Sequence, residues 1–134
     1  MIFDSSVWID YFRGNGSSNV ELLDNLLSRY EDVNVHLCPP IFQEVLQGLH
    51  RSEDPESVKE LLLTCQLLKL DPYFAAESAA GIYRSIRVKG ITVRKPNDCI
   101  IAFYAIHFKM ELAHNDSDFD KIAKHTSLKV YRKK

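Results

Sequence analysis

The sequence predicts an α/β fold built around a mainly parallel sheet. Short apolar, β-compatible runs of three to six residues alternate with longer stretches whose apolar residues recur at helical spacing. With 134 residues, 46% of them hydrophobic, the chain has the size of one compact unit with one core. We therefore expect a single domain spanning residues 1–134.

Five runs are expected to form the strands of this sheet. Each is rich in aliphatic or β-branched residues, and turn-forming or polar residues separate it from the next helix. Parallel pairing is favoured because parallel strands need long crossover connections, which the intervening helices provide. The expected strands cover residues 1–3, 33–38, 65–70, 111–115 and 128–131.

The helices are expected where apolar residues repeat at i, i+3 and i+4. Pro39 and Pro40 suit a first helical turn, because proline lacks only an N–H that the first turn does not use. Gly90 is placed to end one helix, and Asn97 can cap the next. The expected helices cover residues 7–12, 22–30, 39–49, 57–63, 72–89, 98–109 and 119–125.

The net charge of −1 conceals a strong asymmetry between the two parts of the chain. Residues 1–80 carry 13 acids and 5 bases, whereas residues 81–134 carry 5 acids and 12 bases. A basic surface can follow a phosphate backbone, although solvated helix faces and a basic tail explain the same composition. The bases that could contact such a backbone form two clusters, one at Arg84, Arg87, Lys89, Arg94 and Lys95 and the other at Lys121, Lys124, Lys129, Arg132, Lys133 and Lys134.

Apolar content and cysteine usage indicate the cellular compartment. No apolar run approaches the roughly 20 residues of a membrane-spanning helix, and the segment MIFDSSVWIDYF lacks the pattern of a signal peptide. The three cysteines are odd in number and widely spaced, so they predict neither a disulfide framework nor a zinc site. We expect a cytoplasmic protein with reduced, buried thiols and no membrane association.

Two aspartates follow predicted strands directly. Asp4 comes after the first strand and Asp116 after the fourth. In open α/β sheets, ligands bind beyond the carboxyl ends of the strands, so these carboxylates meet if their strands are neighbours. A lone aspartate in such a place is more often a turn or cap residue, and neither is informative by itself.

Two further acids lie in helices that follow strands. Asp98 falls on the same stripe as Ile101, Ala102 and Ala105, the face expected to turn inward, and a carboxylate on that side needs a partner. An interaction with the helix dipole is the alternative explanation. Glu44 lies off the apolar stripe of its helix, and taken alone it is typical of a solvated residue.

Together, the four carboxylates predict a metal site at one edge of the sheet. Hard oxygen ligands in this number suit Mg²⁺ or Mn²⁺. Such an ion offsets the repulsion among the acids and can activate a water against a phosphodiester. Asp118 could be an additional or water-mediated ligand, and Asp120 is more typical of a helix cap.

Other motifs explain these residues less well. Asp116, Asp118 and Asp120 match the first three positions of an EF-hand loop, but Lys121 stands where that loop requires glycine. No glycine-rich phosphate loop, nucleophile elbow or dinucleotide fingerprint is present. His114 lies close to the acids, yet a packed histidine is the simpler interpretation.

Four segments together resemble the PIN-domain nucleases, and within them the VapC-type toxins of toxin–antitoxin pairs. FDSSVWIDYF is similar to the opening strand and helix, PPIFQEVLQGL to the glutamate segment, NDCIIAFYA to the third-acid segment and LAHNDSDFDKIA to the last. Their order and spacing agree over essentially the whole chain. The resemblance assigns the four acids to Asp4, Glu44, Asp98 and Asp116, with Asp118 as an auxiliary ligand and Ser6 as a hydroxyl that supports the metal shell.

The resemblance implies a three-layer α/β/α sandwich whose parallel five-stranded sheet has the order 3-2-1-4-5. It also implies a Mg²⁺- or Mn²⁺-dependent endoribonuclease that binds RNA, forms a homodimer and is silenced by a cognate antitoxin. Trp8, Tyr11 and Phe12 are candidates for a dimer or antitoxin contact, with burial in the core as the alternative for aromatic residues at helical spacing.

Two other functions, and the number of ions, remain open at this stage. A housekeeping PIN nuclease of RNA maturation would carry the same four acids. A non-enzymatic receiver-like phosphoacceptor also gathers carboxylates at a sheet end, with Asp71 as a candidate phosphorylated residue. That module would require an acid beside Asp4, and the next acid is Asp10. The sequence is compatible with one bound ion or two.

Overall fold

Five short strands form one parallel sheet in the computed structural model, which describes residues 1–29 and 33–133. The spatial order is β3-β2-β1-β4-β5, and all four pairings are parallel. The strands are β1 (Ile2–Phe3), β2 (His36–Leu37), β3 (Gln66–Leu67), β4 (Glu111–Ala113) and β5 (Lys129–Val130). The predicted fold class is confirmed, and so is the strand order implied by the family resemblance.

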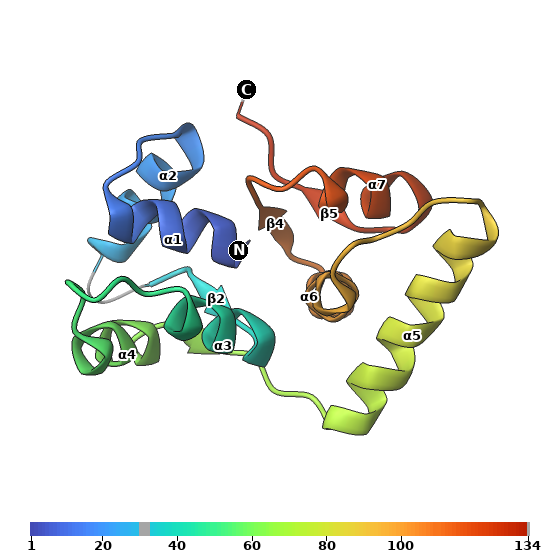
Figure 1. Ribbon diagram of the computed structural model, residues 1–134, viewed down its shortest axis with the longest axis horizontal. Coiled ribbons are helices and arrows are strands. Elements are labelled where there is room, and N and C mark those ends of the chain that lie inside the picture. Colours follow the sequence, from blue (N-terminus) through green and yellow to red (C-terminus); the bar gives the residue numbers. More distant parts are fainter. Residues whose placement is uncertain (30–32, 134) are drawn as a thin grey trace.

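Helices surround this sheet in two groups, one from each part of the chain. Figure 1 shows α1 to α4 on the left and α5 to α7 on the right. Right-handed crossovers place the first group, which follows β1 and β2, on the opposite face from the second, because the chain then reverses direction along the sheet. The helices are α1 (Ser5–Arg13), α2 (Ser18–Leu27), α3 (Pro39–Gln47), α4 (Pro55–Leu63), α5 (Pro72–Val88), α6 (Pro96–His107) and α7 (Asp118–His125).

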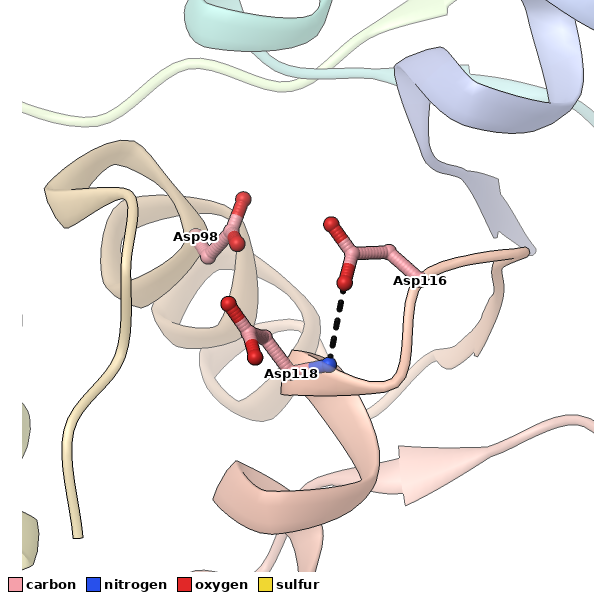
Figure 2. Close-up of side chains that lie close together, drawn as sticks. All are labelled: Asp98, Asp116 and Asp118. Carbon is pink, nitrogen blue, oxygen red and sulfur yellow. Dashed lines mark hydrogen bonds between the residues drawn. The ribbon is translucent and has the colours of Figure 1, made fainter.

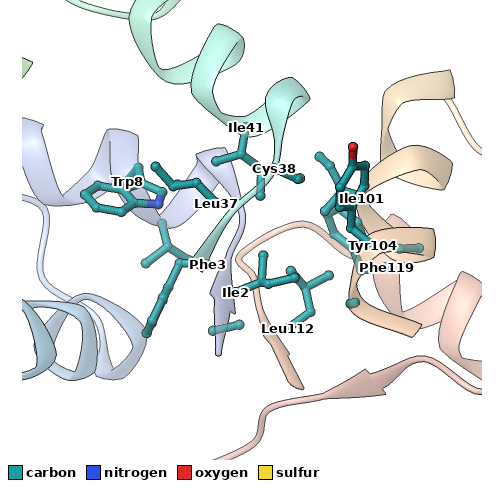
Figure 3. Close-up of a cluster of buried hydrophobic side chains, with 14 of the residues drawn as sticks. Ile2, Phe3, Trp8, Leu37, Cys38, Ile41, Ile101, Tyr104, Leu112 and Phe119 are labelled. Carbon is teal, nitrogen blue, oxygen red and sulfur yellow. The ribbon is translucent and has the colours of Figure 1, made fainter. Parts of the chain in front are cut away.

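The core is centred on the two middle strands. Ile2, Phe3 and Leu112 are fully buried, and Figure 3 shows them with Leu37 of β2 and with helix side chains such as Trp8 and Phe119. Trp8 is also fully buried, so the core interpretation is confirmed for this residue, and Trp8 is excluded from any surface contact. Leu67 on the edge strand β3 is exposed instead.

Residues at the helix N-termini decide where several helices begin, and the predicted starts of α2 and α6 were wrong for this reason. Helix α2 begins at Ser18, before the predicted 22, because the Ser17 side chain accepts a hydrogen bond from the Val20 amide. Helix α6 begins at Pro96 instead of being capped by Asn97, since proline is pre-organised for the first helical position. The predicted helix through Tyr30 extends into residues outside the described part.

The pairing of β1 with β4 positions the candidate site. The Asp4 amide donates to the carbonyl of Ala113 at 2.9 Å, which extends the β1–β4 ladder by one step. Asp4 and the segment after β4 therefore leave the sheet side by side, as the prediction for neighbouring strands required. Among the described residues, no helix combines the length and apolarity needed to cross a membrane.

Candidate metal centre

Asp4 joins the end of β1 to the start of α1, and one of its oxygens lacks a partner. Its Oδ2 accepts hydrogen bonds from the Ser6 amide at 3.1 Å and the Ser6 hydroxyl at 2.7 Å. Its Oδ1 is buried and has no hydrogen-bond partner within the described part of the chain. Only 4% of the residue is exposed. An unpaired buried carboxylate oxygen is costly unless something positive reaches it.

Asp98 presents a second orphaned oxygen from the first turn of α6. The residue is 2% exposed, and its Oδ2 has no partner among the described residues. Its neighbours Ile101, Ala102 and Ala105 are buried, which confirms that Asp98 lies on the inward stripe of its helix. Burial, followed by the negative charge of Asp4, raises the pKa of Asp98 to about 7. The fold by itself therefore resists a full set of ionised carboxylates at this place.

Asp116 and Asp118 complete a compact group of three carboxylates with Asp98. One oxygen from each lies within 4.8 Å of the others, and Figure 2 shows the three side chains directed toward one another. The Asp118 amide donates to Asp116 Oδ1 at 3.0 Å and so stabilises the turn between β4 and α7. Asp118 was expected to be auxiliary, yet it is fully buried and belongs to the group.

Basic side chains of the chain itself compensate two of these acids. Arg94 Nε lies 3.1 Å from Asp118 Oδ2, and Lys121 Nζ lies 3.3 Å from Asp118 Oδ1. Lys95 Nζ lies 3.3 Å from Asp116 Oδ2. Burial opposes ionisation of Asp116 and Asp118, but hydrogen bonds from backbone amides and these bases hold the pKa of both below the ordinary value.

Glu44 lies to one side of the group of three. It accepts a hydrogen bond from the Ser5 hydroxyl at 2.8 Å and is half-buried. Burial, and to a smaller extent the charge of Asp4, raises its pKa. Glu44 also borders an open groove of about 640 Å³ whose other walls include Gln47, Lys95 and Asn97. This groove adjoins the acids and could admit a polymer chain.

A hydrogen-bonded network that the sequence analysis missed supports the turn after β4. The Asn115 amide donates to the Ser6 hydroxyl at 3.1 Å, and its side chain donates to Asp10 at 2.9 Å. The Asp116 amide donates to His114 Nδ1 at 3.1 Å. His114 is packed, as expected, but it also orients the backbone of Asp116. In the sequence, the position of His114 and Asn115 directly before Asp116 was the signal from which this network could have been inferred.

The predicted RNA-contacting bases divide into two sets. Arg94 and Lys95 reach the acids, although more than half of each side chain remains exposed. Arg84 and Arg87 lie on the exposed side of α5 and form no ion pair among the described residues; Arg87 donates to the Thr92 hydroxyl instead. Of the tail bases, Arg132 pairs with Asp120 at 2.7 Å, and Lys134 lies outside the described residues.

The donors present fit a hard metal cation. Orphaned oxygens of Asp4 and Asp98, with one oxygen of Asp116 close to Asp98, supply carboxylate ligands without a histidine or cysteine among them. A divalent ion bound at this group would satisfy the orphaned Asp98 oxygen and would reverse the burial-driven rise in the pKa of Asp98, whereas Asp4 lies outside the group of three and acts on Asp98 through its charge. The geometry therefore supports a metal site, as the sequence predicted.

The chain is similar to known proteins over nearly its whole length. The model of the PIN domain family matches residues 1–125. Ribonuclease VapC11 of Mycobacterium tuberculosis and VapC ribonuclease Mb1587 of Mycobacterium bovis are each 37% identical over 130 residues, which cover 97% of this chain and 96% of theirs. The chain is a PIN-domain protein of the VapC family. The resemblance found in the sequence is confirmed.

A solved structure supports the same fold for this VapC-family chain. VapBC2 from Rickettsia felis, bound to a DNA fragment from its promoter, matches with a TM-score of 0.73 at 14% sequence identity and full coverage of both chains. At that identity the match shows the fold alone. Membership of the VapC family also removes the receiver-like alternative. Asp71, its candidate phosphoacceptor, instead caps α5 by accepting from the Phe74 amide.

Proposed function

We propose that this chain is a metal-dependent endoribonuclease and the toxin of a type II toxin–antitoxin pair, acting in the cytoplasm as a single domain over residues 1–134. The observation that carries the proposal is the compact group of three carboxylates, Asp98, Asp116 and Asp118, together with the orphaned oxygens of Asp98 and of nearby Asp4, whose charge acts on Asp98. Ribonuclease names among relatives that match nearly the whole chain support the same activity.

Asp4, Asp98 and Asp116 would hold Mg²⁺ or Mn²⁺, with Asp118 as an auxiliary group. When bound, the ion supplies an activated water and neutralises charge that develops on the phosphodiester. Ser6 fixes the Asp4 carboxylate through two hydrogen bonds to one oxygen, which leaves the other oxygen directed to the metal. The carboxylates are thus oriented before substrate arrives, as efficient catalysis requires.

Glu44 is suited to take a proton from the attacking water. Burial raises the pKa of Glu44, so this group accepts a proton more readily near neutral pH than a solvated glutamate does. The Ser5 hydroxyl restrains one carboxylate oxygen at 2.8 Å, and the residue borders the groove through which RNA would approach. Glu44 therefore acts as a general base in this proposal, whereas Asp4, Asp98 and Asp116 act as ligands.

RNA would approach along the groove beside Glu44. Arg94 and Lys95 line both this groove and the acid group, where they can attract a phosphate. Arg84 and Arg87 extend the basic surface along α5. Binding by these four residues would be largely independent of sequence, because contacts to phosphate carry no base information.

The proposed partners are a second copy of the chain and a cognate antitoxin. A solved neighbour is a VapBC2 assembly, which supports an antitoxin partner. An antitoxin side chain bearing a guanidinium could enter the acidic site and pair with a carboxylate. Co-expression with the product of an adjacent reading frame should relieve growth inhibition; the absence of such a frame would favour the housekeeping alternative.

Cleavage of RNA by purified protein in Mg²⁺, in Mn²⁺ and in EDTA tests the activity. We expect cleavage with either ion and none with EDTA. Asp98→Asn should abolish it, since this change removes the ligand with an orphaned oxygen. Asp71→Asn is the matched control: it makes the same change at an exposed cap, where asparagine serves equally well. Cleavage that persists in EDTA would refute metal dependence.

A further inference from the structure

Arg94 joins the two acids of the turn between β4 and α7. Its Nε lies 3.1 Å from Asp118 Oδ2 and its Nη2 lies 3.3 Å from Asp116 Oδ1. Its backbone amide also donates to Asp118 Oδ2, at 3.3 Å. Two contacts of the guanidinium bridge the two carboxylates, and the backbone amide of the same residue holds the chain beside Asp118, which is a firmer arrangement than a single surface ion pair.

Asp118 consequently has a protein cation near each oxygen. Arg94 faces Oδ2, and Lys121 lies 3.3 Å from Oδ1. The Asp118 side chain is only 1% exposed, so the surrounding protein rather than solvent must compensate its charge. Because that compensation is already present, Asp118 does not depend on a metal ion to remain ionised in the fold.

The other acids differ from Asp118 in this respect. Asp4 Oδ1 and Asp98 Oδ2 are buried with neither a hydrogen bond nor an ion pair among the described residues, whereas Asp118 Oδ1, which also lacks a hydrogen bond, is ion-paired with Lys121. Asp116 has Arg94 at one oxygen and Lys95 at the other, and the side chains of both bases are more than half exposed. The cluster of carboxylates therefore contains two kinds of position. One kind, at Asp4 and Asp98, has no ion-paired base within the described part of the chain. The other, between Asp116 and Asp118, already holds the Arg94 guanidinium.

We propose that the Arg94 guanidinium occupies the position that a second divalent ion would take, so that each chain binds one ion rather than two. A guanidinium cannot lose its proton to make way for a metal. A second ion between Asp116 and Asp118 would have to displace the Arg94 guanidinium from both carboxylates and against like-charge repulsion. The inference rests on the proposed metal site and adds its stoichiometry.

Counting Mn²⁺ by equilibrium dialysis and by the EPR signal of free ion tests this directly, without measuring cleavage. Metal-free wild-type chain should bind one Mn²⁺. Arg94→Ala should bind two, and Arg94→Gln, which keeps an amide donor toward Asp118 but no charge, should also bind two. Arg132→Ala is the matched control, because it breaks an arginine–aspartate pair at Asp120, outside the group of three, and should bind one.

A double variant identifies the origin of the extra ion. Arg94→Gln with Asp118→Asn should return the count to one, because the second position then lacks both its guanidinium and its carboxylate. Two ions in the wild-type chain, or one ion in a folded Arg94→Gln variant, would overturn the role of Arg94. Failure of wild-type chain to bind any Mn²⁺ would instead overturn the proposed metal centre, and with it this inference.

Discussion

Replacing Asp98 by asparagine should stabilise the metal-free protein while removing its activity. Asp98 is 2% exposed, and burial together with the charge of Asp4 raises its pKa from 3.8 to about 7. At about 1.4 kcal/mol per pKa unit, this rise corresponds to an electrostatic cost on the order of 4 kcal/mol when Asp98 is fully ionised in the fold. Asparagine carries no charge and so avoids that cost.

The pH dependence follows from the sign of the shift. Because the folded-state pKa lies above the unfolded one, the folded chain binds more protons between about pH 4 and pH 7. The stability contributed by protonated Asp98 is complete below the unfolded pKa and is lost as pH rises through about 7. The advantage of Asp98→Asn should therefore be fully developed at pH 8 and small near pH 4.

Urea unfolding in EDTA at pH 8, 6 and 4 measures this advantage, with Asp71→Asn as the control at an exposed site. We expect a free energy of unfolding higher than wild type by up to about 4 kcal/mol at pH 8. A lower stability at pH 8 would mean that Asp98 forms a structural hydrogen bond. An advantage that does not change with pH would mean that charge is not its cause.

Three further predictions concern the metal, the RNA and the turn after β4. Mn²⁺ at a hundred times its Kd should raise the free energy of unfolding of the wild-type chain by about 2.7 kcal/mol, and this gain should vanish in Asp98→Asn; thermal shift with and without EDTA is the measurement. Arg84→Ala should lower the salt slope of RNA binding by about 0.7, and a larger change for Lys133→Ala would move the RNA path to the C-terminus. His114→Ala should cost about 1–3 kcal/mol in urea unfolding, because the Asp116 amide loses its acceptor, whereas His114→Asn should cost less by retaining an oxygen there; equal losses would refute this role.

Much of the fold was predictable from local patterns. Strand and helix order, the inward face of the Asp98 helix and the end of α5 near Gly90 follow from apolar periodicity and from backbone preferences, which neighbouring residues determine. Strand lengths were overestimated; β2, for example, covers only His36–Leu37 of the predicted run 33–38. Apolar composition marks a segment as buried, but only pairing with a neighbouring strand decides which residues join the ladder.

The four acids could be proposed from the sequence because Asp4 and Asp116 each follow a strand directly, Glu44 lies in the helix after β2, and Asp98 lies on the inward stripe of α6. The different electrostatic environments of these acids could not be proposed from the sequence. Asp118 is ion-paired with Arg94, which lies 24 positions away in sequence, while Asp4 and Asp98 each retain an oxygen with no hydrogen bond or ion pair in the described part of the chain. The sequence alone presented Arg94 as an RNA-binding base and Asp118 as an accessory ligand.

Tertiary structure decided these differences because electrostatic compensation depends on distance and burial, and neither can be read from spacing along the chain. Sequence by itself determined the elements, the sheet edge and the chemical type of the site. Only packing of the loop before α6 against the turn before α7 brought the Arg94 guanidinium between Asp116 and Asp118 and left the Asp4 and Asp98 oxygens unpaired.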